Sequence, residues 1–218
     1  MSQIESLTVP PVGKRTREVP GRGTRRVSSR ASNGKSTRRL TLEDFLKLPE
    51  TEPASEFIDG RIIQKVSPKA KHSLLQGEIT ERINRRTKRR RIGLAFVELR
   101  CNFAGRSLVF DVSYLRWDRI ALDENGEPID DVFLHPDFGV EVVSPDQAES
   151  VLAEKLTFAV RHGVKLGWLV NPYNRKVKVF QPGKAPQILA GKDVLSGGPL
   201  MGGFRCTVDQ LFGWLKIS

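Results

Sequence analysis

The sequence predicts an α/β domain in which helices flank a mixed β-sheet, preceded by a disordered basic N-terminal tail. Three observations support this: the order of helical and β patterns, the apolar content and the uneven charge. The chain has 218 residues, of which 39% are hydrophobic and 28% charged. This excludes a wholly disordered protein. No stretch approaches the ~20 apolar residues that a membrane helix requires, so we expect no membrane partner.

The positive charge is concentrated at the N-terminus. Residues 1–40 contain ten Lys or Arg and two acids, whereas residues 41–218 contain 26 basic and 23 acidic side chains. The first segment is rich in Arg, Ser, Pro and Gly and has no apolar period, so we expect it to be disordered. A basic arm would add salt-dependent affinity for phosphates. An organelle transit peptide and an extension without a role remain alternatives.

The first half of the body, residues 41–218, begins with helical and hairpin patterns. Thr41 is a suitable N-cap for a short helix with acids in its first turn. Asp59–Gly60 is a strong turn signal and predicts a hairpin over 56–66. A longer helix is expected over 71–90, because apolar side chains recur there at helical spacing.

The second half is richer in strand patterns. Two β-rich segments, 94–103 and 107–117, flank a turn at Gly105. Residues 138–144 are almost continuously apolar, which is typical of a central strand covered on both faces. The remaining elements are a helix over 147–162, a hairpin around 171–175, a weaker strand at 186–191 and a C-terminal helix over 208–217.

Two acids interrupt the strands that look most buried. Asp111 lies in LVFDVSYL and Glu141 lies in GVEVVSP. A carboxylate in an apolar strand is costly unless it is paired, hydrogen-bonded or bound to metal. On neighbouring strands, the two would form a hard-oxygen site suited to Mg²⁺ or Mn²⁺. The alternative is that each acid points outward from an edge or end of its strand.

A lysine lies on the apolar stripe of the helix that follows Glu141. At 100° per residue, Lys155 falls at the centre of a stripe that includes Ala148, Leu152 and Ala159. Its ammonium group could reach the carboxylates and there orient a water or neutralise developing charge. Snorkelling of the lysine towards solvent is the alternative.

Two further residues are weaker candidates for the same site. His72 shares a helical stripe with Leu75 and Ile79, where a lone histidine is more often a satisfied core residue. Glu56 is an acid at the head of the first strand, and an exposed strand-end acid is its alternative interpretation.

A basic run covers residues 82–91, where seven of ten side chains are Lys or Arg. Cations suit a helix C-terminus, but seven are more than a helix end requires. We interpret the run as a nucleic-acid-binding face near the site. Its members are Arg82, Arg85, Arg86, Lys88, Arg89, Arg90 and Arg91.

Five segments taken together resemble a known family. In order, they are LTLEDFLKLPE, SEFIDGRIIQKVSPKAKHS, LVFDVSYL, HPDFGVEVVSP and EKLTFAVRHGVKLGWLVNP. Their order and spacing are similar to the Uma-type restriction endonuclease family, a largely bacterial branch of the PD-(D/E)XK nuclease superfamily. The resemblance covers residues 41–217. It implies a restriction-endonuclease-like fold and a cytoplasmic, metal-dependent endonuclease.

The resemblance also implies roles for individual residues. Asp111 and Glu141 match the metal-binding carboxylates, and Lys155 matches a lysine that has moved from the strand to the following helix. Glu56 and His72 match the acid of the opening strand and the histidine of the first core helix.

The chain also departs from the family pattern. Phe110 replaces a proline, Arg61 replaces an acid, and Ser73 replaces a glycine. None of these changes removes an expected metal ligand.

The function expected from the sequence is hydrolysis of nucleic-acid phosphodiester bonds, with DNA as the first candidate substrate. Asp111, Glu141 and the carbonyl of Val142 would hold Mg²⁺ or Mn²⁺, and a homodimer is compatible with cleavage of two strands. The alternative from another class is a non-catalytic nucleic-acid-binding protein on the same scaffold. A cleavage assay beside a salt-dependent binding measurement separates the two.

Overall fold

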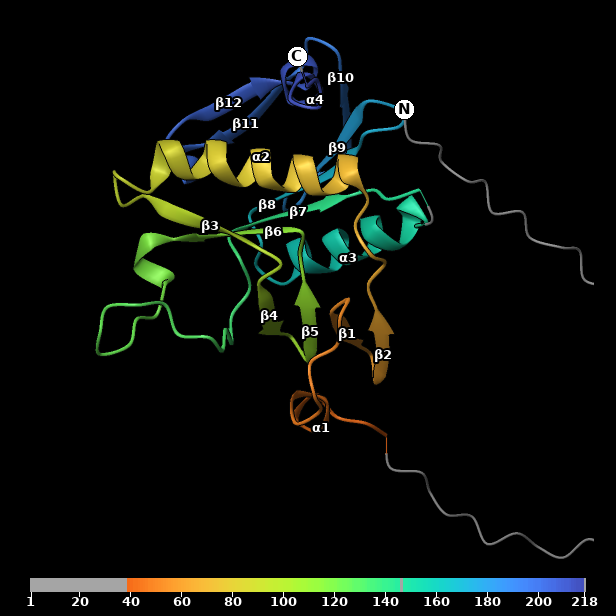
Figure 1. Cartoon of the computed structure of the whole chain (residues 1–218), viewed down its shortest axis with the longest axis vertical. Helices are drawn as coiled ribbons and strands as arrows, with labels where there is room; N and C mark the ends of the chain where they lie inside the picture. The colour runs from red at the N-terminus through yellow and green to blue at the C-terminus, as the bar shows by residue number, and fades with distance from the viewer. Residues whose placement is uncertain (1–38, 146, 218) are drawn as a thin grey trace, which may run out of the picture. The chain divides into compact units, whose positions relative to one another are not determined.

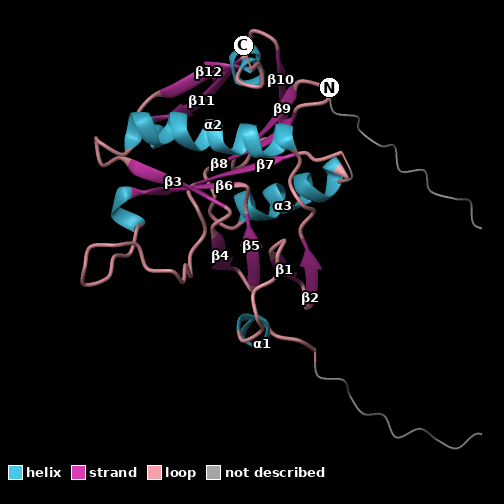
Figure 2. Cartoon of the chain, in the orientation of Figure 1, coloured by secondary structure: helices cyan, strands magenta, loops and turns pink. Residues whose placement is uncertain are grey.

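The computed structural model describes residues 39–145 and 147–217. The tail predicted over residues 1–40 therefore lies almost entirely outside the described residues. Within them, helices flank mixed β-sheets, so the predicted α/β class is confirmed (Figure 2). No helix in these two ranges is long and apolar enough to cross a membrane.

A six-stranded sheet forms the centre of the fold. Its only parallel pair is β7 with β8, and every other neighbouring pair is antiparallel. Its strands in spatial order are β10 (Gln187–Ala190), β9 (Lys176–Phe180), β8 (Leu166–Asn171), β7 (Phe138–Val142), β6 (Val112–Arg116) and β3 (Gly93–Val97). Strand β7 is central and completely buried, as its apolar run predicts.

A second sheet contains the predicted hairpin. Asp59 and Gly60 both have positive φ, the backbone that a tight hairpin turn requires. The strands of this four-stranded antiparallel sheet, in spatial order, are β2 (Arg61–Gln64), β1 (Ser55–Ile58), β5 (Arg106–Val109) and β4 (Arg100–Phe103).

The two β-rich segments around Gly105 form four strands rather than two. The chain leaves the six-stranded sheet after β3, forms β4 and β5 in the other sheet, and returns at β6. Glu98, between β3 and β4, has a φ of 49°, which breaks the first segment. Phe110 and Asp111 form the short junction between β5 and β6.

Four helices accompany the sheets. The short N-terminal helix has the capping box expected from Thr41. The second helix ends three residues earlier than predicted, and the C-terminal helix four residues earlier. The α-helices are α1 (Leu42–Leu46), α2 (Ala70–Thr87), α3 (Glu149–Arg161) and α4 (Val208–Gly213). Short 3₁₀ turns occur at η1 (Trp117–Arg119) and η2 (Pro199–Met201).

A third, two-stranded sheet has no counterpart among the sequence predictions. It pairs β11 (Val194–Gly198) with β12 (Phe204–Thr207). Two glycines, Gly202 and Gly203, adopt positive φ just before β12. The glycine-rich sequence hides the strand pattern of this segment.

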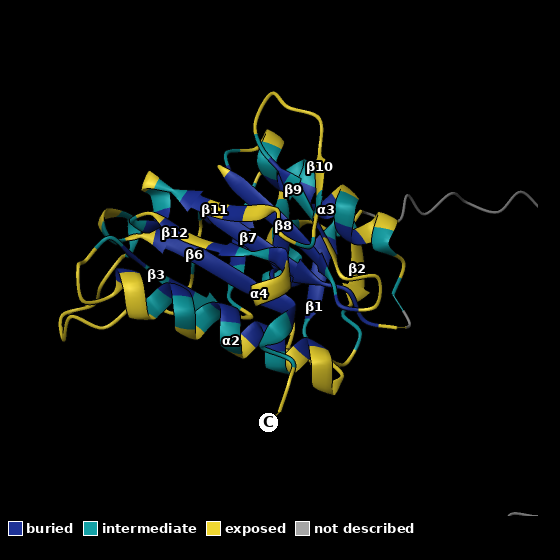
Figure 3. Cartoon of the chain, turned by 90° about the horizontal axis from the view of Figure 1, so that it is seen from above, coloured by how far each residue is buried: buried dark blue, intermediate teal, exposed yellow. Residues whose placement is uncertain are grey.

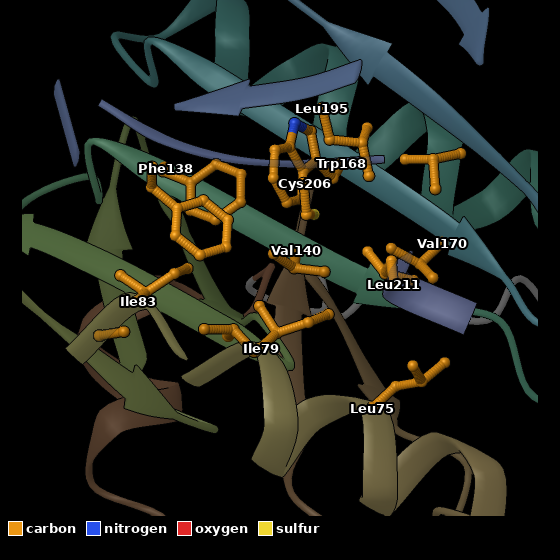
Figure 4. Packing of buried hydrophobic residues seen from close by; sticks show 14 of the residues in the cluster. Leu75, Ile79, Ile83, Phe138, Val140, Trp168, Val170, Leu195, Cys206 and Leu211 are labelled. Carbon is orange, nitrogen blue, oxygen red and sulfur yellow. The ribbon is translucent and has the colours of Figure 1, made fainter. Parts of the chain in front are cut away.

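The six-stranded sheet is covered on both faces. Helix α2, the β11–β12 pair and α4 lie on one face, and α3 lies on the other (Figure 1). On the first face, Leu75, Ile79 and Ile83 of α2 pack with Phe138 and Val140 of β7 (Figure 4). The central strands are buried whereas the outer side of α2 is exposed (Figure 3).

Candidate active site

The first carboxylate of the site lies where the chain passes between two sheets. Asp111 belongs to the β5–β6 junction, so its predicted position within a strand is wrong by one residue. Strands β6 and β7 pair with Val112 opposite Val140. One more step of this antiparallel register places Asp111 opposite Glu141, where cross-strand side chains are neighbours.

The alternation of side chains along β7 determines which face of the sheet the side chain of Glu141 occupies. Phe138, Val140 and Val142 belong to the core on the α2 face, whereas Val143 belongs to the core beneath α3. Side chains alternate along a strand, so Glu141 also faces α3. Its side chain is buried, and the outward-pointing alternative is therefore excluded.

Lys155 of α3 meets Glu141 on this face. Its ammonium nitrogen Nζ lies 2.6 Å from Oε1 of Glu141 and 2.5 Å from Oε1 of Glu56. It also donates a hydrogen bond to the carbonyl of Val109, at 2.9 Å. The lysine is only 5% exposed, so it does not snorkel to solvent. Ala148, by contrast, is an exposed N-cap and not part of the buried stripe.

Glu56 is a full member of this cluster rather than an exposed strand-end acid. Its Oε1 accepts a hydrogen bond of 2.7 Å from the backbone N–H of Val109, in addition to its contact with Lys155. The residue is buried because β1 lies between β2 and β5.

Asp111 is held by groups from three other elements. Nζ of Lys65, which follows β2, donates to its Oδ1 at 2.7 Å, and the backbone N–H of Val142 donates to its Oδ2 at 2.7 Å. Nε2 of His72, on α2, lies 3.0 Å from Oδ2. Nδ1 of His72 lies 3.1 Å from Oγ of Ser144.

The five predicted side chains thus form one connected cluster. Lys65 joins its two halves, because it bonds both Asp111 and the Val109 carbonyl that Lys155 also uses, each lysine at 2.9 Å from that oxygen. Five parts of the chain supply the cluster: the β1–β2 hairpin, α2, the β5–β6 junction, β7 and α3.

The buried charges shift one another's pKa values. Burial raises the pKa of Glu141 to about 8; the ammonium of Lys155 opposes this rise and the negative charge of Asp111 adds to it. Burial acts to lower the pKa of Lys155, but the carboxylates of Glu141, Glu56 and Asp111 outweigh it and raise the pKa. Burial acts to raise the pKa of Asp111, but His72 and Lys65 outweigh it and hold the pKa well below its usual range.

The donor set fits a hard divalent cation. Oε1 of Glu141 is buried and, within the described residues, receives no hydrogen bond despite its ion pair with Lys155. In residues 39–145 and 147–217, no three His, Cys, Asp or Glu side chains form a preformed metal cage. Mg²⁺ does not require one, because it usually binds through one or two carboxylates, waters and substrate phosphates.

A cavity of about 560 Å³ gives access to the cluster. It lies between the β1–β2 hairpin and α3, and Glu56, Lys65, Glu141 and Lys155 line one part of it. Its lining also includes the basic side chains of Arg106 and Arg161, together with the acids Asp59, which pairs with Arg106, and Glu154. The cavity therefore combines buried carboxylates with cations, the pairing that an anionic substrate and a divalent metal require.

The basic run of residues 82–91 does not lie beside this cavity. Arg82, Arg85 and Arg86 are on the last turns of α2, and the other four residues follow the helix. At 1.5 Å per residue, Arg86 is about 20 Å along the helix from His72. The predicted proximity of the run to the site is therefore wrong, because the helix carries the two ends of its sequence apart.

Sequence reasoning missed three contributors. Gln76 donates a hydrogen bond to the backbone carbonyl of Asp111 at 2.8 Å, and its position four residues after His72 on the buried stripe could have revealed it. Lys65 and Ser144 carried no comparable signal. Lys65 follows a strand whose residues are all exposed, so it looks like an ordinary surface lysine.

Comparison with known proteins agrees with this geometry. Residues 42–209 match the model of the Uma2 family, described as "Putative restriction endonuclease". A solved structure from Anabaena variabilis, described as a "putative nuclease belonging to DUF820", is 39% identical. It aligns with a TM-score of 0.78 over 81% of this chain and 99% of its own. No curated protein matches the chain significantly. The match to the family model covers well over half of the sequence, and the chain therefore belongs to the Uma2 family.

Proposed function

We propose that this chain is a metal-dependent endonuclease that hydrolyses phosphodiester bonds of nucleic acid, with DNA as the substrate. The observation that carries the proposal is the buried cluster of Asp111, Glu141 and Lys155, the last two of which line a cavity. Membership of the Uma2 family and the likeness to the Anabaena variabilis protein support a nuclease.

Asp111 and Glu141 are the residues that would hold Mg²⁺ or Mn²⁺, and the carbonyl of Val142 would supply a third oxygen. A bound metal ion of this kind polarises the phosphate and lowers the pKa of a coordinated water. The N–H of Val142 already fixes Oδ2 of Asp111, so one strand end positions both its own carbonyl and the neighbouring carboxylate.

Lys155 would act on the water or on the phosphate. Its ammonium group forms ion pairs with Glu56 and Glu141 and donates a hydrogen bond to the carbonyl of Val109, and these contacts hold it beside the carboxylates. A fixed ammonium group can orient an attacking water and stabilise negative charge on the phosphate in the transition state. The raised pKa keeps this group charged at neutral pH.

Glu56 and His72 would take supporting roles in proton transfer or ligand placement. His72 lies between Asp111 and Ser144, within 3.0 Å of a carboxylate oxygen that would hold the metal. Glu56 anchors Lys155 together with Glu141. Arg161 and Lys65 also line the cavity in which the anionic backbone of the substrate would lie.

The test is a plasmid-nicking time course with Mg²⁺ and Mn²⁺, comparing the wild type with Glu141→Gln. We expect the variant to lose about 100-fold or more in rate, because the amide removes a metal ligand while keeping the volume. Glu154→Gln is the matched control, since Glu154 lines the same cavity from α3 but is exposed. The control should cleave at nearly the wild-type rate.

Filter binding of DNA in metal-free buffer accompanies this assay. Glu141→Gln should retain its affinity, because the substitution leaves every basic side chain of the cavity in place. A wild type that binds but never cleaves with any divalent metal would establish the non-catalytic alternative. A Glu141→Gln variant that cleaves at the wild-type rate would make Glu141 a structural residue.

A further inference from the structure

A second cavity, of about 480 Å³, lies away from the carboxylates, between the end of α2, β12 and α4. We propose that this groove, the arginine groove, binds the phosphate backbone of the nucleic acid at a distance from the bond that is cleaved. The inference rests on the proposed function for its ligand class. The groove is lined by Arg82, Arg85, Arg86, Gly203, Phe204, Arg205, Cys206, Gln210 and Trp214.

The charge of the arginine groove is strongly one-sided. Four of its nine lining residues are arginines and none is an acid. Arg82 and Arg85 have acidic partners on the outer face of α2, at 2.7 Å from Glu78 and 3.7 Å from Glu81. Arg86 bonds only a backbone carbonyl among its described contacts, and Arg205 has an exposed side chain on β12. Two positive charges in the groove therefore remain available to an anion.

The loop before β12 holds Arg86 in place. Nε of Arg86 donates to the carbonyl of Gly202 at 2.7 Å, which leaves the other nitrogens of the guanidinium for a ligand. Gly202 and Gly203 have φ values of 58° and 76°, and a Cβ at Gly203 would lie 3.3 Å from Nη2 of Arg86. The glycines thus allow the close approach that orients the guanidinium, so less side-chain entropy is lost on binding.

Trp214 adds a flat surface to the groove. The guanidinium of Arg82 lies 4.4 Å from the centre of its indole ring, and an ion pair with Glu78 also holds this guanidinium. Ordered guanidinium planes and aromatic rings are the groups on which nucleic-acid backbones and bases rest. A membrane surface suits this geometry less well, because the charges line a concave groove and not a projecting face.

The position of the arginine groove sets a minimum length for the ligand. Arg86 is about 20 Å from His72 along α2. Phosphates of one DNA strand are ~3.4 Å apart along the duplex axis, so at least about six nucleotides separate the two sites. The groove therefore adds affinity for long substrates without touching the cleaved bond.

The decisive experiment compares two charge-matched double variants. Arg86→Gln with Arg205→Gln removes the two available charges of the groove. Lys184→Gln with Lys192→Gln removes two charges from exposed loops elsewhere. Binding of a labelled 30-base-pair duplex is measured in metal-free buffer over a range of salt concentrations. We expect the groove variant to lose tenfold or more in affinity at low salt, with the slope of log K against log salt reduced by about 2.

The control should lose less than threefold, and Arg205→Gln alone should reproduce about half of the effect if the double variant fails to fold. Equal losses in the two double variants, or an unchanged slope in the groove variant, would overturn the proposal. The proposal would also be overturned if binding of the protein to phosphatidylserine vesicles required Arg86 and Arg205 while binding to the duplex did not.

Two readouts separate this inference from the proposed function. With plasmid substrate, the groove variant should raise KM and leave kcat within twofold of the wild type. Trp214 fluorescence should change when duplex is added, and this change should be absent in Trp214→Phe. If no metal supports cleavage, and only the groove double variant loses affinity for the duplex, the nuclease proposal is wrong and the proposed phosphate-binding role of the arginine groove stands. If the protein cleaves DNA but the two double variants bind the duplex equally well, the proposed role of the arginine groove is wrong and the nuclease proposal stands.

Discussion

At the scale of single residues, the site depends on buried charges that compensate one another. Glu56, Asp111, Glu141 and Lys155 are each at most 6% exposed, and Lys65 lies beside them. Removing one partner of such a buried network leaves an uncompensated charge, which is strongly destabilising. Glu141 has a raised pKa because burial penalises its charged form more than the nearby ammonium of Lys155 favours it.

The raised pKa of Glu141 leads to a prediction on stability. The group titrates at its ordinary value of 4.5 when the chain is unfolded, and at about 8 when it is folded. The folded state therefore binds this proton more tightly than the unfolded state. The resulting contribution to the free energy of unfolding is fully present below pH ~4.5 and is lost as the pH rises to 8. Glu141→Gln has no such loss, so in metal-free buffer its stability relative to the wild type should rise between pH 5 and pH 8, by at most about 1.4 kcal/mol per pH unit.

Urea unfolding at pH 5, 6.5 and 8 in the presence of EDTA measures this difference. The control is Glu154→Gln, for which the difference from the wild type should change little across the same range. A Glu141→Gln variant that becomes steadily less stable than the wild type as the pH rises would contradict the assignment.

At the scale of elements, α3 carries the lysine to the sheet. Leu152, Leu156 and Ala159 pack this helix against Leu169 of β8, and Lys155 lies within the same buried face. The helix stops at Gly163, whose φ of +116° is rarely adopted by other residues. A Cβ there would lie 2.4 Å from Nε2 of His135.

Adding a single methyl group at Gly163, just after the end of α3, should therefore destabilise the protein. Gly163→Ala combines a strained backbone with a steric clash, so it should lower the free energy of unfolding by about 2–4 kcal/mol. Gly183→Ala is the control, because Gly183 has a φ of 70° and open space around its Cα. It should cost about 1–2 kcal/mol, from the backbone alone. Equal losses of stability in the two variants would show that His135 moves aside without cost.

At the scale of the whole molecule, most of the net charge is carried by residues outside the two described ranges. Both apolar cores are built from residues within the described ranges. Residues 1–40 contribute +8 of the formal +11. The residues that form the apolar cores are therefore largely separate from those that carry the net positive charge, and it is this charge that would attract phosphate.

Deleting residues 1–38 should leave the thermal unfolding midpoint of the body within about 2 °C of the wild type, because their sequence has no apolar periodicity that would tie them to the core. The deletion should weaken binding of all DNA sequences alike and flatten the dependence of log K on log salt. Calorimetry and salt titrations with two unrelated duplexes test this. An unchanged salt slope, or a shortened chain that no longer folds, would show that the tail has another role.

The sequence by itself determined the class of fold, most of the elements and the identity of the charged cluster. Periodicity located α2, α3 and β7, because burial of one face leaves a regular apolar pattern. A turn signal located the β1–β2 hairpin. Asp111, Glu141 and Lys155 stood out because a charged residue is conspicuous in an otherwise apolar pattern.

The tertiary structure alone decided how these residues meet and where the rest of the positive charge lies. Asp111 comes opposite Glu141 because the chain changes sheets at Phe110 and Asp111, and no local pattern encodes that crossing. Lys65 joins the cluster through a contact spanning 46 residues, and solvent-exposed neighbours conceal it in the sequence. The basic run lies about 20 Å from the site because a helix of 18 residues is a rigid spacer. Long-range contacts of this kind depend on the packing of whole elements, which residue-by-residue preferences do not specify.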